Sequence, residues 1–477
     1  METKINICPL NMFQGIKKFL FLLIIPLIRG GIYYIVNGNF YFWLKGSWID
    51  ISTILTILVL SIARYNNYTI LVNDYYISLK QGIVKRKQIN IPKKKIYYIT
   101  AEIPFYYRII NVIRLKCYTL CKNEKYSNIK IIVTKSNFYK LKPLIFNNID
   151  IQKNNFKNIS FTKTIQTALL SLTMSNSLAG IVLISTFIST SSKILGYHLE
   201  TDLYGPFTVI TKKLAFGFSP AGAAITYILL AGWFVAFTKN LILYINFNLK
   251  KINNKLITSI GLLNNKIEYI DIEQINYIDV VQNIFTKTIN LSSVFINICN
   301  NKKLITIIPS ISTHLLTFSI DNIFNIDNFN KCSNKLKPHK ISFFSYIIFP
   351  ILFFASTFFV CYKLIITYPQ WAEFLYFIIL INGIICFWLL IIKLVDSQTS
   401  SVSFKENTCY IRYSRMFKFH NVIIPKNKIS KIVLKQTFMQ KIFKNCNIYI
   451  YSFSTKPTKH FCKNINITAA KQLLHTI

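Results

Sequence analysis

Acidic residues are scarce in this sequence, which has only 17 Asp and Glu among 477 residues, against 56 Lys and Arg. Enzyme sites usually need convergent acids, bases or metal ligands, and the six histidines show no metal-ligand spacing. His198, Glu200 and Asp202 lie close together in one segment, which we interpret as a solvated loop. The sequence therefore predicts no enzymatic activity, no cofactor and no metal site.

Glycine-rich phosphate-binding loops are also missing, because Gly30 and Gly31 lack the surrounding pattern. The ten cysteines are scattered along the chain, so we expect free thiols and no disulfide framework. Cys117 and Cys121 form a C-x3-C pair without a second pair, which is weak evidence for a metal site.

Charged residues make up only 15% of the chain, whereas 52% of it is hydrophobic; soluble proteins average about 25% charged. The apolar excess lies in blocks of about 17 to 25 residues, the length of a helix that crosses a bilayer. The first block has no cleavage site after it, so we interpret it as a retained span. We predict six transmembrane helices in three hairpins, with a turn at the aromatic residues 40–43: 19–36, 48–63, 167–190, 221–244, 341–363 and 374–394.

Positive charge is concentrated in three long segments, residues 64–163, 239–340 and 393–471. All but six of the 56 Lys and Arg lie in these segments or in the amino-terminal flank, and basic residues beside spans are retained on the cytoplasmic side. The sequence therefore predicts a multi-pass protein of the cell membrane, with both termini and the three segments in the cytoplasm.

The three segments are internal repeats. When Gly82, Gly261 and Arg415 are aligned, apolar and polar residues recur at the same offsets without a gap. The matching sets are Ile91, Pro92, Lys95, Ile96, Ile99, Ile103 and Arg108; then Ile270, Asp271, Gln274, Ile275, Ile278, Gln282 and Lys287; then Ile424, Pro425, Lys428, Ile429, Ile432, Gln436 and Lys441.

Each repeat predicts short half-buried strands followed by one helix. Alternating β-branched and aromatic residues at 68–72, 75–79, 129–133 and 448–451 indicate strands. Gly82 and Gly261 lie where a tight turn needs a positive φ. Carboxyl-terminal helices are expected at 136–146, 312–323 and 468–474, with Ser136, Ser312 and Thr468 as caps.

A small antiparallel β-sandwich closed by one helix, repeated behind pairs of membrane helices, resembles the bacterial pleckstrin-homology-like (PH-like), membrane-flanked domain family. The resemblance implies an α+β protein of the bacterial inner membrane, and suggests a role in envelope stress or antimicrobial resistance with a smaller relative as partner. The predicted domains are 1–63 (flank and helices 1–2), 64–150 (first PH-like domain), 167–245 (helices 3–4), 246–325 (second PH-like domain), 326–340 (linker), 341–395 (helices 5–6) and 396–477 (third PH-like domain).

Three classes of function remain open on the sequence. We favour a non-catalytic scaffold or sensor at the inner leaflet, because membrane tethering makes anionic lipid, and not nucleic acid, the nearer partner of a chain with net charge +39. A protein partner in the membrane is expected as well. The alternative is a transporter or permease component, in which Arg29 or the Ser/Thr-rich third helix lines a pathway.

The first repeat should be the strongest anion binder, because residues 64–163 have 20 basic against four acidic residues. Its charge concentrates in two triplets that flank a short predicted strand: Lys85, Arg86 and Lys87, then Lys93, Lys94 and Lys95. We expect this domain to bind anionic vesicles, more weakly as salt rises, and glutamine at all six positions to remove most of the binding. Vesicle co-sedimentation checks this, and equal binding by the more acidic second repeat would contradict it.

Overall fold

The computed structural model describes two main parts of the chain and several short stretches. The described residues are 3–5, 8–13, 24, 27, 28, 31, 38, 40–146, 157–158, 167–169, 171, 220–324, 335–339 and 343–475, with gaps at 74, 83–85, 120–127, 253, 263, 299–303, 406 and 454–456. These residues divide into two compact units, and each is described here by itself.

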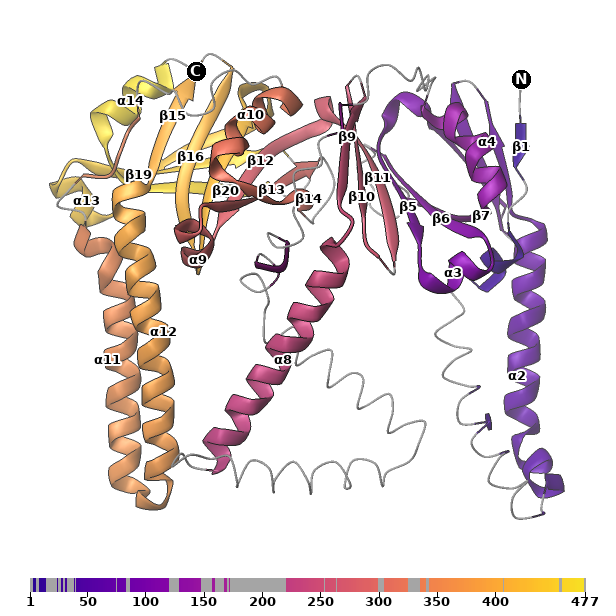
Figure 1. Ribbon diagram of the computed structural model, residues 1–477, viewed down its shortest axis with the longest axis horizontal. Coiled ribbons are helices and arrows are strands. Elements are labelled where there is room, and N and C mark those ends of the chain that lie inside the picture. Colours follow the sequence, from indigo (N-terminus) through magenta and orange to yellow (C-terminus); the bar gives the residue numbers. More distant parts are fainter. Residues whose placement is uncertain are drawn as a thin grey trace. The chain divides into compact units, whose positions relative to one another are not determined.

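Four helices in the described residues are long and apolar enough to cross a membrane. They are α2 (Phe40–Asn66), α8 (Pro220–Tyr244), α11 (Phe343–Thr367) and α12 (Ala372–Thr399). The last two pack as an antiparallel hairpin joined by the 3-10 turn η5 (Pro369–Trp371), as Figure 1 shows. The predicted spans 19–36 and 167–190 lie mostly outside the described residues.

The aromatic residues 40–43 do not form the predicted turn, because α2 already begins at Phe40. Gly38 has a φ of 71° and lies in a turn just before this helix. Aromatic side chains are compatible with a helix that ends near a membrane interface, so their presence did not require a break in the helix.

Unit 1 contains the first repeat, which forms two antiparallel sheets around one core. The first sheet has the order β1-β2-β3-β4, and β7, β6 and β5 lie in order in the second, which continues into β11 and β10 of the second repeat. Helix α4 packs Phe138 and Leu141 into this core. The elements are β1 (Thr3–Ile5), β2 (Thr69–Val72), β3 (Tyr76–Gln81), β4 (Lys87–Pro92), η2 (Lys93–Lys95), β5 (Ile96–Ile103), α3 (Phe105–Ile109), β6 (Val112–Thr119), β7 (Asn128–Thr134), α4 (Lys135–Phe146), β10 (Lys255–Ile260) and β11 (Asn265–Asp271).

Unit 2 contains the third repeat and later strands of the second. One sheet has the order β14-β13-β12-β17-β16-β15, and a second has the order β18-β19-β20. The elements are β9 (Asn248–Ile252), η3 (Ile272–Gln274), β12 (Ile275–Gln282), α9 (Ile284–Thr288), β13 (Leu291–Ile298), β14 (Ile305–Ser312), α10 (Thr313–Phe324), β15 (Ser401–Lys405), β16 (Thr408–Arg415), β17 (Lys418–Pro425), η6 (Lys426–Lys428), β18 (Ile429–Lys435), α13 (Phe438–Ile442), β19 (Asn445–Ser452), β20 (Lys459–Asn466) and α14 (Ile467–His475).

The repeat alignment is reproduced by irregularities of the backbone. Strands β5, β12 and β18 each carry a register shift against the following strand at the same aligned position, between residues 96 and 98, 275 and 277, and 429 and 431. A second set follows each short helix, where Asn111, Asn290 and Lys444 all have a positive φ. The three copies therefore share their local geometry as well as their sequence pattern.

The turns after the second strand of each copy, which follow β3, β10 and β16, behave as the sequence predicts. Gly82 and Gly261 have φ values of 125° and 101°. A Cβ on Gly261 would lie 2.3 Å from the carbonyl oxygen of Asn264, so only glycine fits there. In the third copy the positive φ moves to Met416, beside the aligned Arg415.

The carboxyl-terminal helices are confirmed, but two of their caps lie earlier than predicted. Thr134 accepts a hydrogen bond from the Asn137 backbone N–H (3.4 Å), and Asn466 accepts one from the Thr468 backbone N–H (3.0 Å). Ser136 and Thr468 are therefore inside their helices. Helix ends vary by one or two residues, so the sequence pattern fixed the helices better than their caps.

The seven cysteines of the described residues are free and buried, as expected for free thiols. Cys117 lies in a closely packed core with a pKa raised to about 12 by burial. That environment favours the neutral thiol, so Cys117 is a core residue and a poor metal ligand. Cys121 lies outside the described residues.

Candidate functional site: the junctions between consecutive copies

The predicted basic triplets lie around the two ends of a short strand, as expected from the sequence, and their binding of anions stays a prediction. Strand β4 lies between them, and its six residues span about 20 Å. Lys93 is only 8% exposed, which removes it from a surface site. Arg86 and the η2 residues Lys94 and Lys95 are exposed, Lys87 is half-buried, and Lys85 lies outside the described residues, as do Arg29, His198, Glu200 and Asp202.

The structure instead brings polar groups together where one copy meets the next. In unit 1, β5 of the first copy pairs with β11 of the second, and in unit 2, β12 of the second copy pairs with β17 of the third. Both pairs are antiparallel, with Glu268 opposite Thr100 at the first junction and Val422 opposite Asp279 at the second. In the repeat alignment Asp279 corresponds to Thr100 and Val422 to Glu268, so the two junctions have the same register. Each junction is thus a strand added to the edge of the preceding copy's sheet.

The first junction buries the carboxylate of Glu268, which is 2% exposed. It accepts hydrogen bonds from the Tyr98 hydroxyl (2.8 Å) and the Thr258 hydroxyl (3.1 Å), and it pairs with Lys266. Burial and the neighbouring carboxylate raise the pKa of Tyr98, so the phenol stays a donor to Glu268. A buried charge that is paired in this way is strongly destabilised when a partner is lost.

The second junction buries a different carboxylate at the same cross-strand position. Asp279 is 3% exposed, and the Nδ1 atom of His420 donates to it at 2.9 Å. The ring of Tyr413 stacks on His420 with centroids 5.2 Å apart, and its hydroxyl lies 3.1 Å from Nδ1 of His460. Tyr277 of β12 meets the edge of His460 at 4.6 Å, so the polar chain crosses from the second copy into the third.

Both buried carboxylates come from the second copy. In the sequence, Glu268 and Asp279 belong to an acidic cluster that also contains Asp271 and Glu273, and of these four only Glu273 aligns with a lysine of the first copy, Lys94. We interpreted this cluster only as weaker anion binding. Their alternation with apolar residues in strands was the available signal that some of them point into a buried face.

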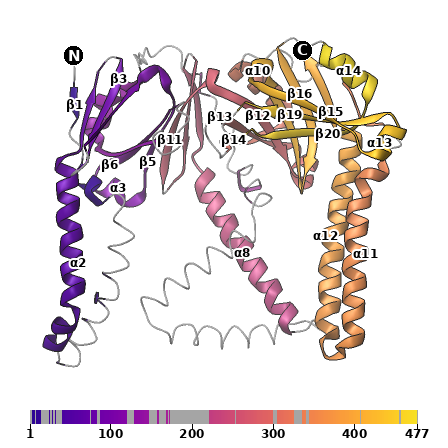
Figure 2. The same cartoon turned by 180° about the vertical axis from the view of Figure 1, so that it is seen from behind.

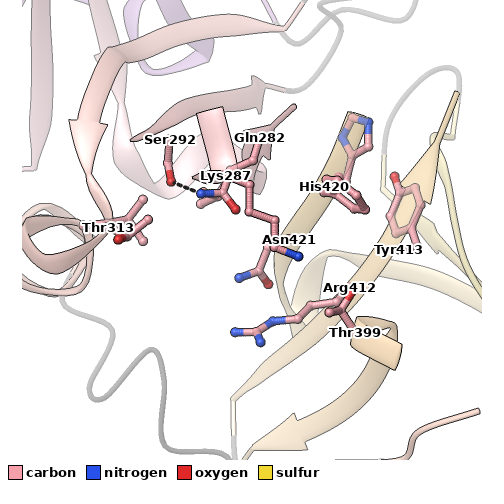
Figure 3. Close-up of a pocket in the computed structure, with 12 residues that line it drawn as sticks. Gln282, Lys287, Ser292, Thr313, Thr399, Arg412, Tyr413, His420 and Asn421 are labelled. Carbon is pink, nitrogen blue, oxygen red and sulfur yellow. Dashed lines mark hydrogen bonds between the residues drawn. The ribbon is translucent and has the colours of Figure 1, made fainter. Parts of the chain in front are cut away.

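A cavity of about 280 Å³ lies at the second junction, next to the end of α12. In Figure 3, the Gln282 amide is held by Ser292 on one side, and Arg412 and Asn421 project from the neighbouring strands. The lining residues also include Lys287, Thr313, Thr399, Tyr413 and His420.

The cavity is electropositive. Lys287 and Arg412 both line it, and burial together with the nearby Arg412 lowers the pKa of Lys287, while Asp396 opposes this effect. Hydroxyl and amide groups around two cations suit an anionic group. No cluster of three or more potential metal ligands occurs among the described residues.

The two buried carboxylates should each stabilise a junction. Changing Glu268→Gln or Asp279→Asn removes the charge that Lys266 or His420 pairs with, and we expect each change to lower the free energy of unfolding by about 1 to 3 kcal/mol. Thermal unfolding of the full chain in detergent measures this. The control is Glu273→Gln, since Glu273 is exposed; an equal effect of all three changes would contradict the assignment.

The second junction should also weaken in mild acid. Burial and the nearby His420 and Arg415 lower the pKa of His460 from 6.5 to about 3. The unfolded chain therefore binds more protons between these values, so the free energy of unfolding falls by about 1.4 kcal/mol per pH unit below about 6.5. Unfolding curves between pH 7.5 and 5 should have a shallower pH dependence in His460→Gln than in the unchanged protein; identical slopes would refute this.

Comparison with known proteins agrees with the fold. The family model described as "Bacterial PH domain" matches residues 19–139 and 351–477, together more than half of the chain. These segments contain most of the first copy and all of the third, and the second copy lies between them. Neither the curated proteins nor the solved structures contain a significant match. With its repeated sandwiches and junctions, the chain belongs to the bacterial PH domain family.

Proposed function

We propose that this protein is a non-catalytic, membrane-anchored scaffold whose PH-like domains are joined edge to edge on the cytoplasmic side of the bacterial inner membrane. The observation that carries the proposal is the pairing of consecutive copies in one register, at both β5–β11 and β12–β17. Each pairing joins strands of two consecutive copies within one compact unit. The charged groups at the junctions form structural ion pairs, so we assign these domains a role in binding and not in catalysis.

A direct connection between the last membrane helix and the third domain supports this proposal. Helix α12 ends at Thr399 and β15 begins at Ser401, so one residue separates the helix from the sandwich. Ser414 of β16 donates to Asp396 of α12 at 2.7 Å and accepts from Lys393 at 2.8 Å. The domain cannot tumble freely on the helix, so its orientation follows that of the membrane hairpin.

Apolar side chains on the short helices support a location at the lipid surface. Phe438 and Met439 of α13 are 80% and 66% exposed, and Phe285 of α9 contacts Trp388 of α12, with ring centroids 5.0 Å apart. Figure 2 shows α13 beside the domain end of α11 and α14 on the far side. Exposed apolar patches of this kind suit membrane contact.

The finer parts of the proposal have less support. Anionic lipid as a ligand rests on the basic excess and on the electropositive cavity lined by Lys287 and Arg412. The role in envelope stress or antimicrobial resistance, and the smaller partner, rest on the family resemblance alone. The transporter alternative gains no observation from the described residues.

Cysteine labelling tests the topology that the scaffold requires. Gln370→Cys lies between α11 and α12, and Lys471→Cys lies on the exposed side of α14. An impermeant maleimide should label the first in intact spheroplasts and the second only after lysis, because the hairpin places these residues on opposite sides. Labelling of Lys471→Cys in intact spheroplasts would overturn the cytoplasmic assignment.

A further inference from the structure

Strand β18 is the third member of a set whose other two members each carry a strand from the next copy. In the repeat alignment it corresponds to β5 and β12, which pair with β11 and β17. Within the described part of the chain, β18 pairs with β19 alone and forms the edge of its sheet. An edge with this geometry presents backbone N–H and C=O groups to any added strand.

The residues of β18 are less buried than those of its counterparts β5 and β12. The central residues of β5 and β12 are buried throughout, as the pairs Thr100 with Ala101 and Asp279 with Val280 illustrate. In β18, Ser430, Lys431 and Lys435 are exposed, and the remaining residues are only half-buried. The edge is therefore open on the face that the next copy covers at the other two junctions.

A basic residue lies at the same aligned position next to each of the three edge strands, and at the two occupied junctions it contacts the following copy. Arg108 donates to the Leu262 carbonyl oxygen of the following copy (3.2 Å), and Lys287 lies 4.7 Å from the centre of the Phe419 ring of the following copy. The aligned Lys441 is exposed. The third copy thus has a basic residue at the position that contacts the following copy at both occupied junctions.

The charges at β18 specify what would fit there. Each occupied junction buries one carboxylate at the same cross-strand pair, from Glu268 opposite Thr100 or from Asp279 opposite Val422. In β18 that position is Val433, so the added strand must supply the acid. Lys431 and Lys435 flank it on the same face, held over the rings of Tyr451 and Tyr449.

We propose that the β18 edge binds an edge strand of a partner protein that carries acidic side chains opposite Val433 and Lys435. This deepens the scaffold proposal, on which it rests, by naming the docking edge and the chemistry of the partner. Main-chain pairing supplies affinity and the alternate side chains supply specificity. Lysines on an open edge also hinder indiscriminate pairing.

A second copy of this chain does not satisfy these charges. Its corresponding edge strand is β4, and the shared register would place Lys87 opposite Lys435 and Ile89 opposite Val433. Like charges directly opposite each other destabilise an antiparallel pair. Self-pairing is therefore an outcome that the test must separate from the proposal.

The first experiment measures peptide binding to the full chain in phosphatidylcholine nanodiscs. The probe is a fluorescent peptide, LNNEIEYIDI, which is the β11 segment with the change Lys266→Glu, and its counterpart LNNKIKYIDI has lysine at both acidic positions. We expect the acidic peptide to bind at least tenfold more tightly by fluorescence anisotropy. Binding of both peptides with equal affinity, or of neither, would overturn the proposal.

Matched variants of the protein then locate the site. Lys431→Glu with Lys435→Glu should weaken binding of the acidic peptide at least tenfold, whereas Lys335→Glu with Lys337→Glu, which changes the same charge at two exposed positions, should not. Unfolding curves verify that both variants fold. If the β18 variant instead loses binding only to phosphatidylglycerol vesicles, the face binds lipid and the proposal is wrong.

Disulfide trapping tests the register. In a background where the cysteines at 121, 299 and 332 are serine, Val433→Cys should crosslink to LNNEICYIDI at least tenfold faster than to LNNECEYIDI, because only the first places its cysteine opposite residue 433. Equal rates, or crosslinking mainly between two copies of the chain, would refute the proposal. The topology labelling is independent, so its result separates failure of this edge from failure of the scaffold.

Discussion

The unpaired edge of a small β-sheet is the constraint on which much of this structure depends. A PH-like sandwich has open edges, and an open edge presents backbone groups that either pair or face water. In this chain the edges at β5 and β12 are closed by strands of the following copy. The same pairing joins strands of consecutive copies within each compact unit.

The buried carboxylates show how specific that pairing is. A strand that slips by one residue turns its side chains to the opposite face, and a slip at a junction would move Glu268 away from Tyr98, or Asp279 away from His420. An unpaired buried charge is costly, so these contacts oppose a slipped register. The backbone supplies the attraction and the carboxylates fix the alignment.

The long apolar helices α11 and α12 constrain the third domain in a different way. Only one residue separates α12 from β15, and the network of Lys393, Asp396 and Ser414 ties the helix to β16. The Tyr346 hydroxyl of α11 also donates to the Lys463 carbonyl oxygen at 3.3 Å. The third sandwich is therefore coupled to both helices of its hairpin.

The architecture could be predicted from the sequence because its signals are local. Apolar runs of spanning length predicted the four helices that the described residues contain, and the aligned residues after Gly82, Gly261 and Arg415 predicted the repeats. Periodicity and positive-φ glycines depend on neighbours in the chain, so one sequence is enough to read them. Two of the caps were misplaced by two residues for the same local reason, since several polar residues compete at each helix end.

The candidate site could not be predicted in the same way. Charge density pointed to the lysines around β4, but Lys93 is buried and the two triplets are separated by a strand. The residues that meet at the junctions are far apart in the sequence, such as Tyr98 with Glu268 and Asp279 with His420. The sequence by itself determined the helices, the repeats and the excess of positive charge. Only the tertiary structure decided which edges pair and which acids are buried, because strand pairing between copies is a long-range contact that leaves no local pattern.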